Sequence, residues 1–510
     1  MRKRLLLVLP ALIGAALVPA DQTSEAQVSA VPSPAERVAK LTGPGSINDT
    51  EARFALKATD LGILWDNGSE EILTAFGDSY GSGWTGPGGG AGDPATIDWR
   101  CNLLFRSKDR NLADGMSLDS AAEDHPGHAK QFLDCKKVDR DEHTVIPTGG
   151  IAVGKRQYVQ YMSVNYWGPA GSWFTNYSGF AYSDDNGETW TKDPNARWQN
   201  TKAWDNNFQM VALVRDTPSG FVYMIGTPNG RFGNAHIARV PEKLVLQKSA
   251  WRYWDGRTWS PQESAAAPIA IGPVSEVSVQ WNAHLGKWLM MYLDETRASV
   301  VLRSSTSLTG PWSGEKVVVK GKDFPGLYGT YMHPWSSGED LYFTMSQWDP
   351  YNVFLMRTKL TDDGQATNLV TDPGFEDQTG STPTSPWQLN GRGGIDRTNL
   401  GHSGANNAYV RDSIGTHQLQ QNVAVRPHHR YRLSAWMRTA ENNTETMLGV
   451  RTLRGSTIAQ KTSGAHPAYE KVSVEFDSGR ESLIQLYGGF FGRGQDVWLQ
   501  LDDVVLEEIG

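Results

Sequence analysis

The chain has 510 residues and a formal net charge of −8 at pH 7, which is enough length for roughly two to four domains. Charged residues make up only 20% of the chain, whereas it contains 53 glycines and 19 tryptophans. This composition argues against a helical bundle and favours a glycine-punctuated, aromatic-rich β protein. The negative charge, without a basic stripe, argues against nucleic acid as a partner and is compatible with a neutral ligand.

The N-terminus has the pattern of a secretory signal. Three basic residues are followed by the apolar run LLLVLPALIGAALV and by small residues suited to cleavage, so we expect a signal peptide over residues 1–20. Residues 21–45 are rich in Ser, Pro, Ala and Gln and predict a disordered leader. No later stretch is apolar enough to span a membrane. We therefore expect a secreted monomer without a membrane span.

Two cysteines are present, Cys101 and Cys135. Export permits disulfides, so one bridge between them is the natural expectation, and two reduced thiols are the alternative. The segment between them is polar, and a covalent clamp would restrict it.

A repeated pattern of strands and turns runs from about residue 58 to 366. Its recurring third strands are NLLFRSKD, SGFAYSDD, AHIARV, ASVVLRSS and NVFLMRTK. Five copies at this spacing predict a five-bladed β-propeller over residues 46–366. The motif Ser183–Trp190 fits an Asp box, which we interpret as a structural hairpin turn.

The pattern of strands and turns changes near residue 368. The segment opens with NLVTDPGFED and closes with DVWLQLDDVVLEE, with period-two strands and frequent turns between them. It resembles carbohydrate-binding jelly-roll modules, so a β-sandwich is expected over residues 367–510. The resemblance implies a structural Ca²⁺ shared by Glu376 and Asp502 or Asp503; solvated acids at strand ends are the alternative. The polar boundary predicts a separable module with few contacts to the propeller; the alternative is a sandwich that packs against the propeller and completes its funnel.

A pair of aspartates is the strongest chemical signal. In TDLGILWDNGSEEILTAFGD, a symmetric hairpin about Gly68 and Ser69 places residue 60 opposite residue 77. Asp60 and Asp78 then lie at one end of the hairpin, where they could serve as the two carboxyls of glycoside hydrolysis. The alternative is that Asp60 caps a turn and Asp78 stabilises its loop.

Aromatic and polar residues near strand ends could complete a sugar site, because aromatic faces stack on sugar rings and polar groups bind hydroxyls. No metal or other cofactor is expected for catalysis. The candidate substrate-binding residues are Trp84, Trp99, Arg100, Glu142, His143, Trp167, Gln209, Glu276, Asp294, His333, Gln347 and Trp348.

Several segments taken together resemble a known family. They include TDLGILW, AFGDSYG, HTVIPTGGIAVG, YVQYMSVNYWG, GTPNGRFG, GLYGTYMHPW and MSQWDPYNVFLMRT. The propeller resembles the exported endo-D-arabinofuranases of glycoside hydrolase family 183, formerly a domain family of unknown function. The resemblance implies cleavage of internal α-linked D-arabinofuranosyl chains, as in the arabinogalactan and lipoarabinomannan of mycobacterial envelopes. It also implies that Asp60 and Asp78 are the catalytic carboxylates.

Two other functions stay open at this point. The chain could hydrolyse a different furanoside such as L-arabinan, because one fold hosts several activities. It could also be a glycan-binding propeller without catalysis. Which aspartate is the acid, and whether the reaction retains or inverts configuration, do not follow from the residues.

Overall fold

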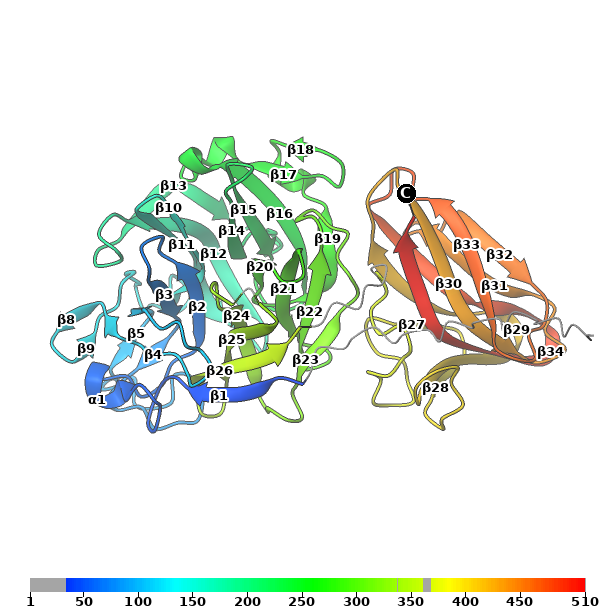
Figure 1. The fold of residues 1–510 in the computed structure, drawn as a ribbon, viewed down its shortest axis with the longest axis horizontal. Helices are drawn as coiled ribbons and strands as arrows, with labels where there is room; N and C mark the ends of the chain where they lie inside the picture. Colours follow the sequence, from blue (N-terminus) through cyan, green and yellow to red (C-terminus); the bar gives the residue numbers. More distant parts are fainter. Residues whose placement is uncertain (1–33, 337, 361–367, 510) are drawn as a thin grey trace, which may run out of the picture.

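The computed structural model describes residues 34–336, 338–360 and 368–509. The chain is almost entirely β-structure in two parts, a propeller followed by a sandwich (Figure 1). The expected signal peptide and residues 21–33 of the expected leader lie outside the described residues. Among the residues that are described, no helix combines the length and apolar character needed to cross a bilayer.

Five antiparallel sheets form the blades of the propeller, which confirms the predicted fold (Figure 1). Each innermost strand contacts the next one around the ring, and the last contacts the first, so the ring is closed. The innermost strands are β2 (Leu61–Asp66), β10 (Thr144–Val153), β14 (Met210–Asp216), β20 (Ser278–Asn282) and β24 (Leu327–Met332).

The second and third strands of each blade are mostly buried, because both faces of each sheet pack against neighbouring blades. The second strands are β3 (Ile72–Phe76), β11 (Arg156–Trp167), β15 (Phe221–Thr227), β21 (Lys287–Asp294) and β25 (Asp340–Gln347). The third strands are β6 (Leu103–Ser107), β12 (Trp173–Ser183), β16 (Gly233–Pro241), β22 (Ser299–Ser305) and β26 (Asn352–Lys359). The five repeats in the sequence are these third strands.

The outer strands are more irregular. They are β7 (Ser120–Ala121), β13 (Thr191–Gln199), β17 (Arg252–Trp254), β23 (Lys316–Lys320) and β1 (Glu36–Lys40). Short additions are β4 (Ser79–Tyr80), β5 (Trp99–Arg100), β8 (Glu123–His125), β9 (His128–Ala129), β18 (Trp259–Ser260) and β19 (Pro268–Val274). The helical turns are α1 (Thr50–Phe54), η1 (Glu242–Leu244), η2 (Lys248–Ala250) and η3 (Glu263–Ala265).

The strand β1 corrects the expectation that the leader extends to residue 45. It pairs antiparallel with β26 and supplies the outer strand of the last blade, so the first and last strands of the propeller meet in one sheet. In the sequence ERVAK, Glu36 and Arg37 are exposed at the edge of the sheet, where charged residues are well tolerated. The composition of residues 36–40 is therefore typical of the polar leader, although these residues form a strand.

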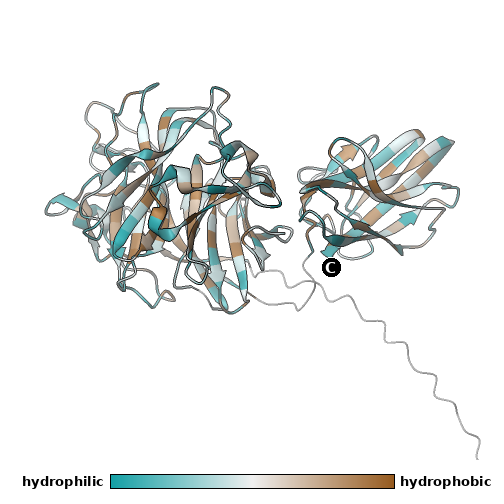
Figure 2. Ribbon diagram, turned by 90° about the horizontal axis from the view of Figure 1, so that it is seen from above, coloured by the Kyte–Doolittle hydropathy of each residue, from teal (hydrophilic) through white to brown (hydrophobic). Residues whose placement is uncertain are grey.

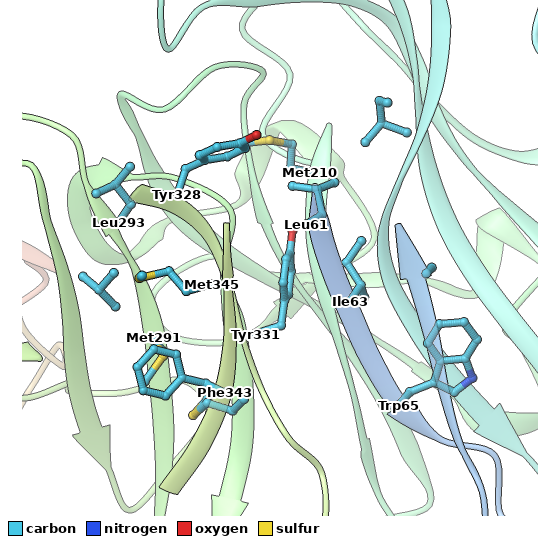
Figure 3. Packing of buried hydrophobic residues seen from close by; sticks show 14 of the residues in the cluster. Leu61, Ile63, Trp65, Met210, Met291, Leu293, Tyr328, Tyr331, Phe343 and Met345 are labelled. Atoms are coloured by element: carbon cyan, nitrogen blue, oxygen red, sulfur yellow. The ribbon is translucent and has the colours of Figure 1, made fainter. Parts of the chain in front are cut away.

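A hydrophobic cluster fills the space between the innermost strands. Leu61, Ile63 and Trp65 project from β2, and Tyr328 and Tyr331 project from β24 on the facing side of this cluster (Figure 3). All five side chains are buried. This packing holds the ends of the innermost strands at fixed positions.

Two local features of the blades agree with the sequence. In the Asp box, the Asp185 carboxylate accepts hydrogen bonds from the N–H of Thr189 (2.9 Å) and the hydroxyl of Ser183 (2.7 Å), as expected for a structural turn. Cys101 and Cys135 form the expected disulfide, with their Cα atoms 6.6 Å apart. The bridge closes the insertion that carries β8 and β9.

The C-terminal part is the expected sandwich. Its strands are β27 (Gln388–Asn390), β28 (Gly393–Asp396), β29 (Asn407–Ala424), β30 (Arg430–Thr439), β31 (Thr446–Thr452), β32 (Thr457–Ser463), β33 (Glu470–Asp477) and β34 (Leu483–Glu508). The long strands β29 and β34 pair along most of their length and cover a separate hydrophobic core. Hydrophobic and hydrophilic residues alternate along these strands (Figure 2).

The sandwich is more firmly attached to the propeller than the sequence predicts. The guanidinium of Arg297, in the propeller, pairs with Asp294 (2.7 Å), Glu315 and, across the boundary, Asp377 (3.0 Å). The N–H of Glu315 also donates to the hydroxyl of Thr371 (3.0 Å). Since the Arg297 side chain is only 6% exposed, this ion-pair network is part of a packed interface, which contradicts the expectation of few contacts.

Candidate active site

Asp60 and Asp78 lie at the same end of the β2–β3 hairpin, as expected. Pairs from Ile63↔Ala75 to Asp66↔Ile72 centre the hairpin on Ser69, and a bulge at Gly62 then shifts the pairing to Leu61↔Phe76. The N–H of Gly77 donates to the carbonyl of Asp60 (3.2 Å). Residue 60 therefore lies opposite residue 77, and the bulge, which needs the left-handed φ of 86° at Gly62, helps to set this register.

Two tyrosines hold the Asp60 side chain. The hydroxyls of Tyr328 and Tyr351 each donate to Oδ2 of Asp60 at 3.0 Å. Oδ1 of Asp60 is buried and has no hydrogen-bond partner. A Cβ at position 77 would lie only 2.4 Å from this atom, so position 77 requires glycine. Burial raises the pKa of Asp60 to about 7, the negative charge of Asp78 adds to the increase, and the tyrosine hydrogen bonds oppose it.

Asp78 is held from another direction. Its Oδ1 accepts hydrogen bonds from the hydroxyl of Thr144 (2.6 Å) and the indole N–H of Trp99 (2.9 Å). Burial raises the pKa of Asp78 to about 6, although these hydrogen bonds and the nearby His143 and Lys137 lower it. Asp78 thus loses its proton at lower pH than Asp60 does, and its charge then favours the protonated form of Asp60.

Both carboxyls face a cavity of about 810 Å³ at one end of the central channel. Its lining combines buried polar groups with apolar and aromatic side chains, which is typical of small-molecule and saccharide sites. Trp167 and Trp348 are 43% and 52% exposed, so their rings are available to stack on a ligand. Of the predicted residues, the lining includes Asp60, Asp78, His143, Trp167, Glu276 and Trp348.

A partly buried ion-pair cluster forms a second wall of the cavity. Arg231 pairs with Glu276 (3.0 Å) and Glu295 (3.4 Å), and its guanidinium lies over the ring of Tyr328, 4.8 Å from the centroid. Tyr328 in turn donates to Asp60. Arg231 therefore orders the tyrosine that holds one of the two carboxyls.

The other predicted residues lie outside the cavity lining. Most are satisfied by the protein itself, which the residue type and strand-end position did not reveal. Trp84 bonds the carbonyl of Gly88, Trp99 bonds Asp78, Arg100 bonds the carbonyls of Ala55 and Ala129, Glu142 bonds Ser163, Gln209 bonds Thr175, Asp294 pairs with Arg297, and Gln347 bonds Arg37. His333 is fully buried, and burial lowers its pKa to about 4.

Sequence reasoning missed the side chains that position the pair. Tyr328, Tyr351, Thr144 and Arg231 lie within the segments that resemble the known family, yet nothing in the sequence distinguishes them from other strand residues. Tyrosine and threonine are frequent in strands of any β protein, so their type carries no signal. Tyr328 and Tyr351 belong to the last blade, which ring closure brings against the first, whereas Thr144 and Arg231 come from the second and third blades.

The expected calcium ligands lie together in the sandwich. Glu376 accepts the N–H groups of Ala405 and Asn406, both at 2.8 Å, and Asp502 accepts the N–H of His402 at 2.7 Å. A Cβ at Gly374 would lie 3.6 Å from Oδ1 of both Asp502 and Asp503 and 3.9 Å from Cγ of Glu376. Burial and the charge of Asp503 raise the pKa of Asp502 to about 7. The oxygens of these acids already accept hydrogen bonds from the protein, and among the described residues the three acids do not form a group whose ligand atoms all lie within 4.8 Å of one another.

The fold and site define a five-bladed β-propeller with a paired-carboxyl cavity at one end of its channel. The chain belongs to the family described as a domain of unknown function, DUF4185, which matches residues 45–357. Notoamide biosynthesis cluster protein J of Aspergillus sp. (strain MF297-2) is 32% identical over 345 residues, which cover 64% of this chain and 89% of that protein. Protein J′ of Aspergillus versicolor is 30% identical over 320 residues, covering 60% and 84% respectively.

Solved structures of low sequence identity have a partly similar chain course. An exo-β-1,3-galactanase from Phanerochaete chrysosporium is 11% identical with a TM-score of 0.38, over 93% of this chain and all of that one. A family 43 arabinoxylan arabinofuranohydrolase from Bacillus subtilis is 10% identical with a TM-score of 0.36, over 93% and 99% of the two chains. These likenesses are too low to carry a functional assignment.

Proposed function

We propose that the protein is a secreted glycoside hydrolase that cleaves internal α-D-arabinofuranosyl linkages of arabinogalactan and lipoarabinomannan. The observation that carries the hydrolase proposal is the buried pair Asp60 and Asp78 on one wall of an aromatic-lined cavity. Glycoside hydrolysis uses one protonated and one ionised carboxyl on either side of the bond. The D-arabinan substrate rests on the motifs that resemble the endo-D-arabinofuranases.

In this proposal Asp60 is the general acid and Asp78 is the base or nucleophile. Asp60 has the higher pKa, about 7 against about 6, so it still carries a proton when Asp78 is ionised. His143 and Lys137 favour the ionised form of Asp78. Tyr328 and Tyr351 orient Asp60, and Trp99 and Thr144 orient Asp78.

Substrates with different leaving groups test these roles. An arabinofuranosyl oligosaccharide with a dinitrophenyl leaving group needs no protonation, so Asp60→Asn is expected to cleave it while failing on the natural polymer. Asp78→Asn is expected to fail on both. The reverse result would exchange the roles of the two residues.

The substrate is tested by incubation with mycobacterial arabinogalactan and, separately, with plant L-arabinan, followed by chromatography. Oligosaccharides from arabinogalactan alone are expected. Products from L-arabinan alone would support the alternative furanoside hydrolase, and no products from either would support a glycan-binding propeller. The anomer formed first, observed by NMR, distinguishes retention from inversion.

For the sandwich, the proposal is a structural Ca²⁺ held by Glu376 and by Asp502 or Asp503, in a secreted chain that acts as a monomer on polysaccharide. Chelation is expected to lower the Tm of the sandwich, and added Ca²⁺ is expected to restore it. An unchanged Tm in the presence of a chelator would leave these acids as ordinary hydrogen-bond acceptors.

A further inference from the structure

A second group of ligand-type side chains lies on the insertion of the first blade, outside the cavity. Strands β8 and β9 form a hairpin in which His125 pairs with His128 across a turn, with Gly127 in the left-handed region at φ 82°. The two imidazole rings meet edge to face with centroids 4.6 Å apart. Asp124 Oδ1 lies 2.7 Å from Nδ1 of His128 and 3.2 Å from Nδ1 of His125.

This convergence has the composition of a transition-metal site. Asp124, His125 and His128 each offer one ligand atom, and these atoms all lie within 4.8 Å of one another. Within residues 34–336, 338–360 and 368–509, no other three His, Cys, Asp or Glu residues meet this condition. Imidazole and carboxylate ligands suit Zn²⁺, Ni²⁺ and Cu²⁺. Bonds of about 2.0 to 2.2 Å to one ion require ligand atoms roughly 3 to 3.5 Å apart, so the observed separations need only a small opening.

A second carboxylate gives His128 the orientation of a metal ligand. The Nε2 atom of His128 lies 3.4 Å from Oδ2 of Asp98, and Asp98 is itself paired with Arg100 at 3.1 Å. If Nε2 carries the proton toward Asp98, Nδ1 is left with a free lone pair directed at Asp124. An outer carboxylate that orients a ligating histidine in this way is a recurring part of metal sites.

We propose that Asp124, His125 and His128 bind one divalent first-row transition-metal ion, with Zn²⁺ as the probe ion, and that Asp98 positions His128. Water completes the coordination, since His125 and Asp124 have side chains 67% and 52% exposed. The ion clamps the hairpin and takes no part in bond cleavage.

The hairpin is connected to the residues around Asp78. The carbonyl of Ala129, next to His128, accepts a hydrogen bond from Nη1 of Arg100 at 2.8 Å. Arg100 follows Trp99, whose indole holds Asp78. The proposed ion therefore stabilises the insertion from which Trp99 reaches the cavity.

Calorimetric titration of the full chain, without a polyhistidine tag and after removal of bound metal, tests the site. Wild-type protein is expected to bind one Zn²⁺ at this site with a Kd at or below about 10 µM. His125→Ala and His128→Ala are expected to weaken this binding at least 10-fold, and Asp98→Asn by roughly 10- to 100-fold. His284→Ala is the matched control, because His284 is an exposed histidine of another blade.

A second readout separates loss of the site from loss of the fold. Added Zn²⁺ is expected to raise the Tm of wild type and of His284→Ala but not of His125→Ala, whose exposed side chain is dispensable for folding. The proposal is overturned if wild type does not bind Zn²⁺ at 100 µM, or if the folded His125→Ala and His128→Ala variants bind it as wild type does. In that case Asp124 and His128 form only a surface hydrogen bond.

Discussion

Asp60 and Asp78 have raised pKa values because both carboxyls are buried. The negative charge of Asp78 raises the pKa of Asp60 further. The active form in our proposal has Asp78 ionised and Asp60 protonated. We expect kcat/KM to fall below about pH 6, as Asp78 gains a proton, and above about pH 7, as Asp60 loses its proton. A pH–rate profile measures this directly, and a flat profile between pH 4 and pH 9 would contradict the assignment.

The same pKa shift has a cost in stability. An acid with a raised pKa in the folded state contributes stability below its unfolded pKa, near 3.9, and this contribution is lost as the pH rises through about 7. Asp60→Asn removes the titration. We therefore expect the free energy of unfolding to decline less between pH 5 and pH 7 in this variant, by at most about 1.4 kcal/mol per pH unit.

Glu70→Gln, in the exposed turn of the same hairpin, is the matched control and is expected to keep the wild-type pH dependence. Denaturant titrations at each pH give the required free energies. A steeper decline in Asp60→Asn than in wild type would contradict the pKa shift.

At the scale of single residues, the sequence predicted the carboxyl pair but not the side chains that hold it. The pair lies within one hairpin, so the turn at Gly68 and Ser69 was sufficient to locate it. Tyr328 and Tyr351 reach Asp60 across 268 and 291 residues of sequence. No local pattern specifies such a contact, because it depends on ring closure.

At the scale of elements, the third strand of each blade was predictable because it is a buried, strongly apolar run. The outer strand β1 was not, because it is charged and lies far in sequence from its partner β26. The disulfide was predictable because the chain has only two cysteines.

The disulfide gives a prediction about the insertion. Closing a loop of 34 residues is worth roughly 3 to 4 kcal/mol in the entropic model. We expect the double substitution Cys101→Ser with Cys135→Ser to lower the Tm and weaken substrate affinity through Trp99, while the five blades still fold. Thermal unfolding and KM measure the two effects, and recovery of insoluble protein alone would show that the bridge is needed for folding.

At the scale of the whole molecule, the propeller and the sandwich share a buried ion-pair network. Arg297 keeps Asp294 and Glu315 as partners when Asp377 is removed, so the loss is one charged hydrogen bond, roughly 1.5 to 3 kcal/mol. We expect Asp377→Asn to lower the Tm of the full chain without changing kcat on a short oligosaccharide. Asp396→Asn, distant from the interface network in sequence and on β28, is a matched control in the sandwich.

If Asp377→Asn left the Tm unchanged, the interface would contribute little and the sandwich would act as the loosely attached module that the sequence predicts. If it abolished turnover in a folded sample, the sandwich would be part of the catalytic unit. The sequence could not distinguish these outcomes, since Arg297 and Asp377 are 80 residues apart and both look like ordinary surface charges.

Digestion of mycobacterial arabinogalactan by wild type, Asp60→Asn and Asp78→Asn tests the central proposal most directly. Wild type is expected to release oligosaccharides of several lengths early in the reaction, as an endo-acting enzyme does. Both variants are expected to release them at least 10²-fold more slowly while keeping their fold by circular dichroism. Absence of products from wild type, or wild-type rates in either folded variant, would contradict it.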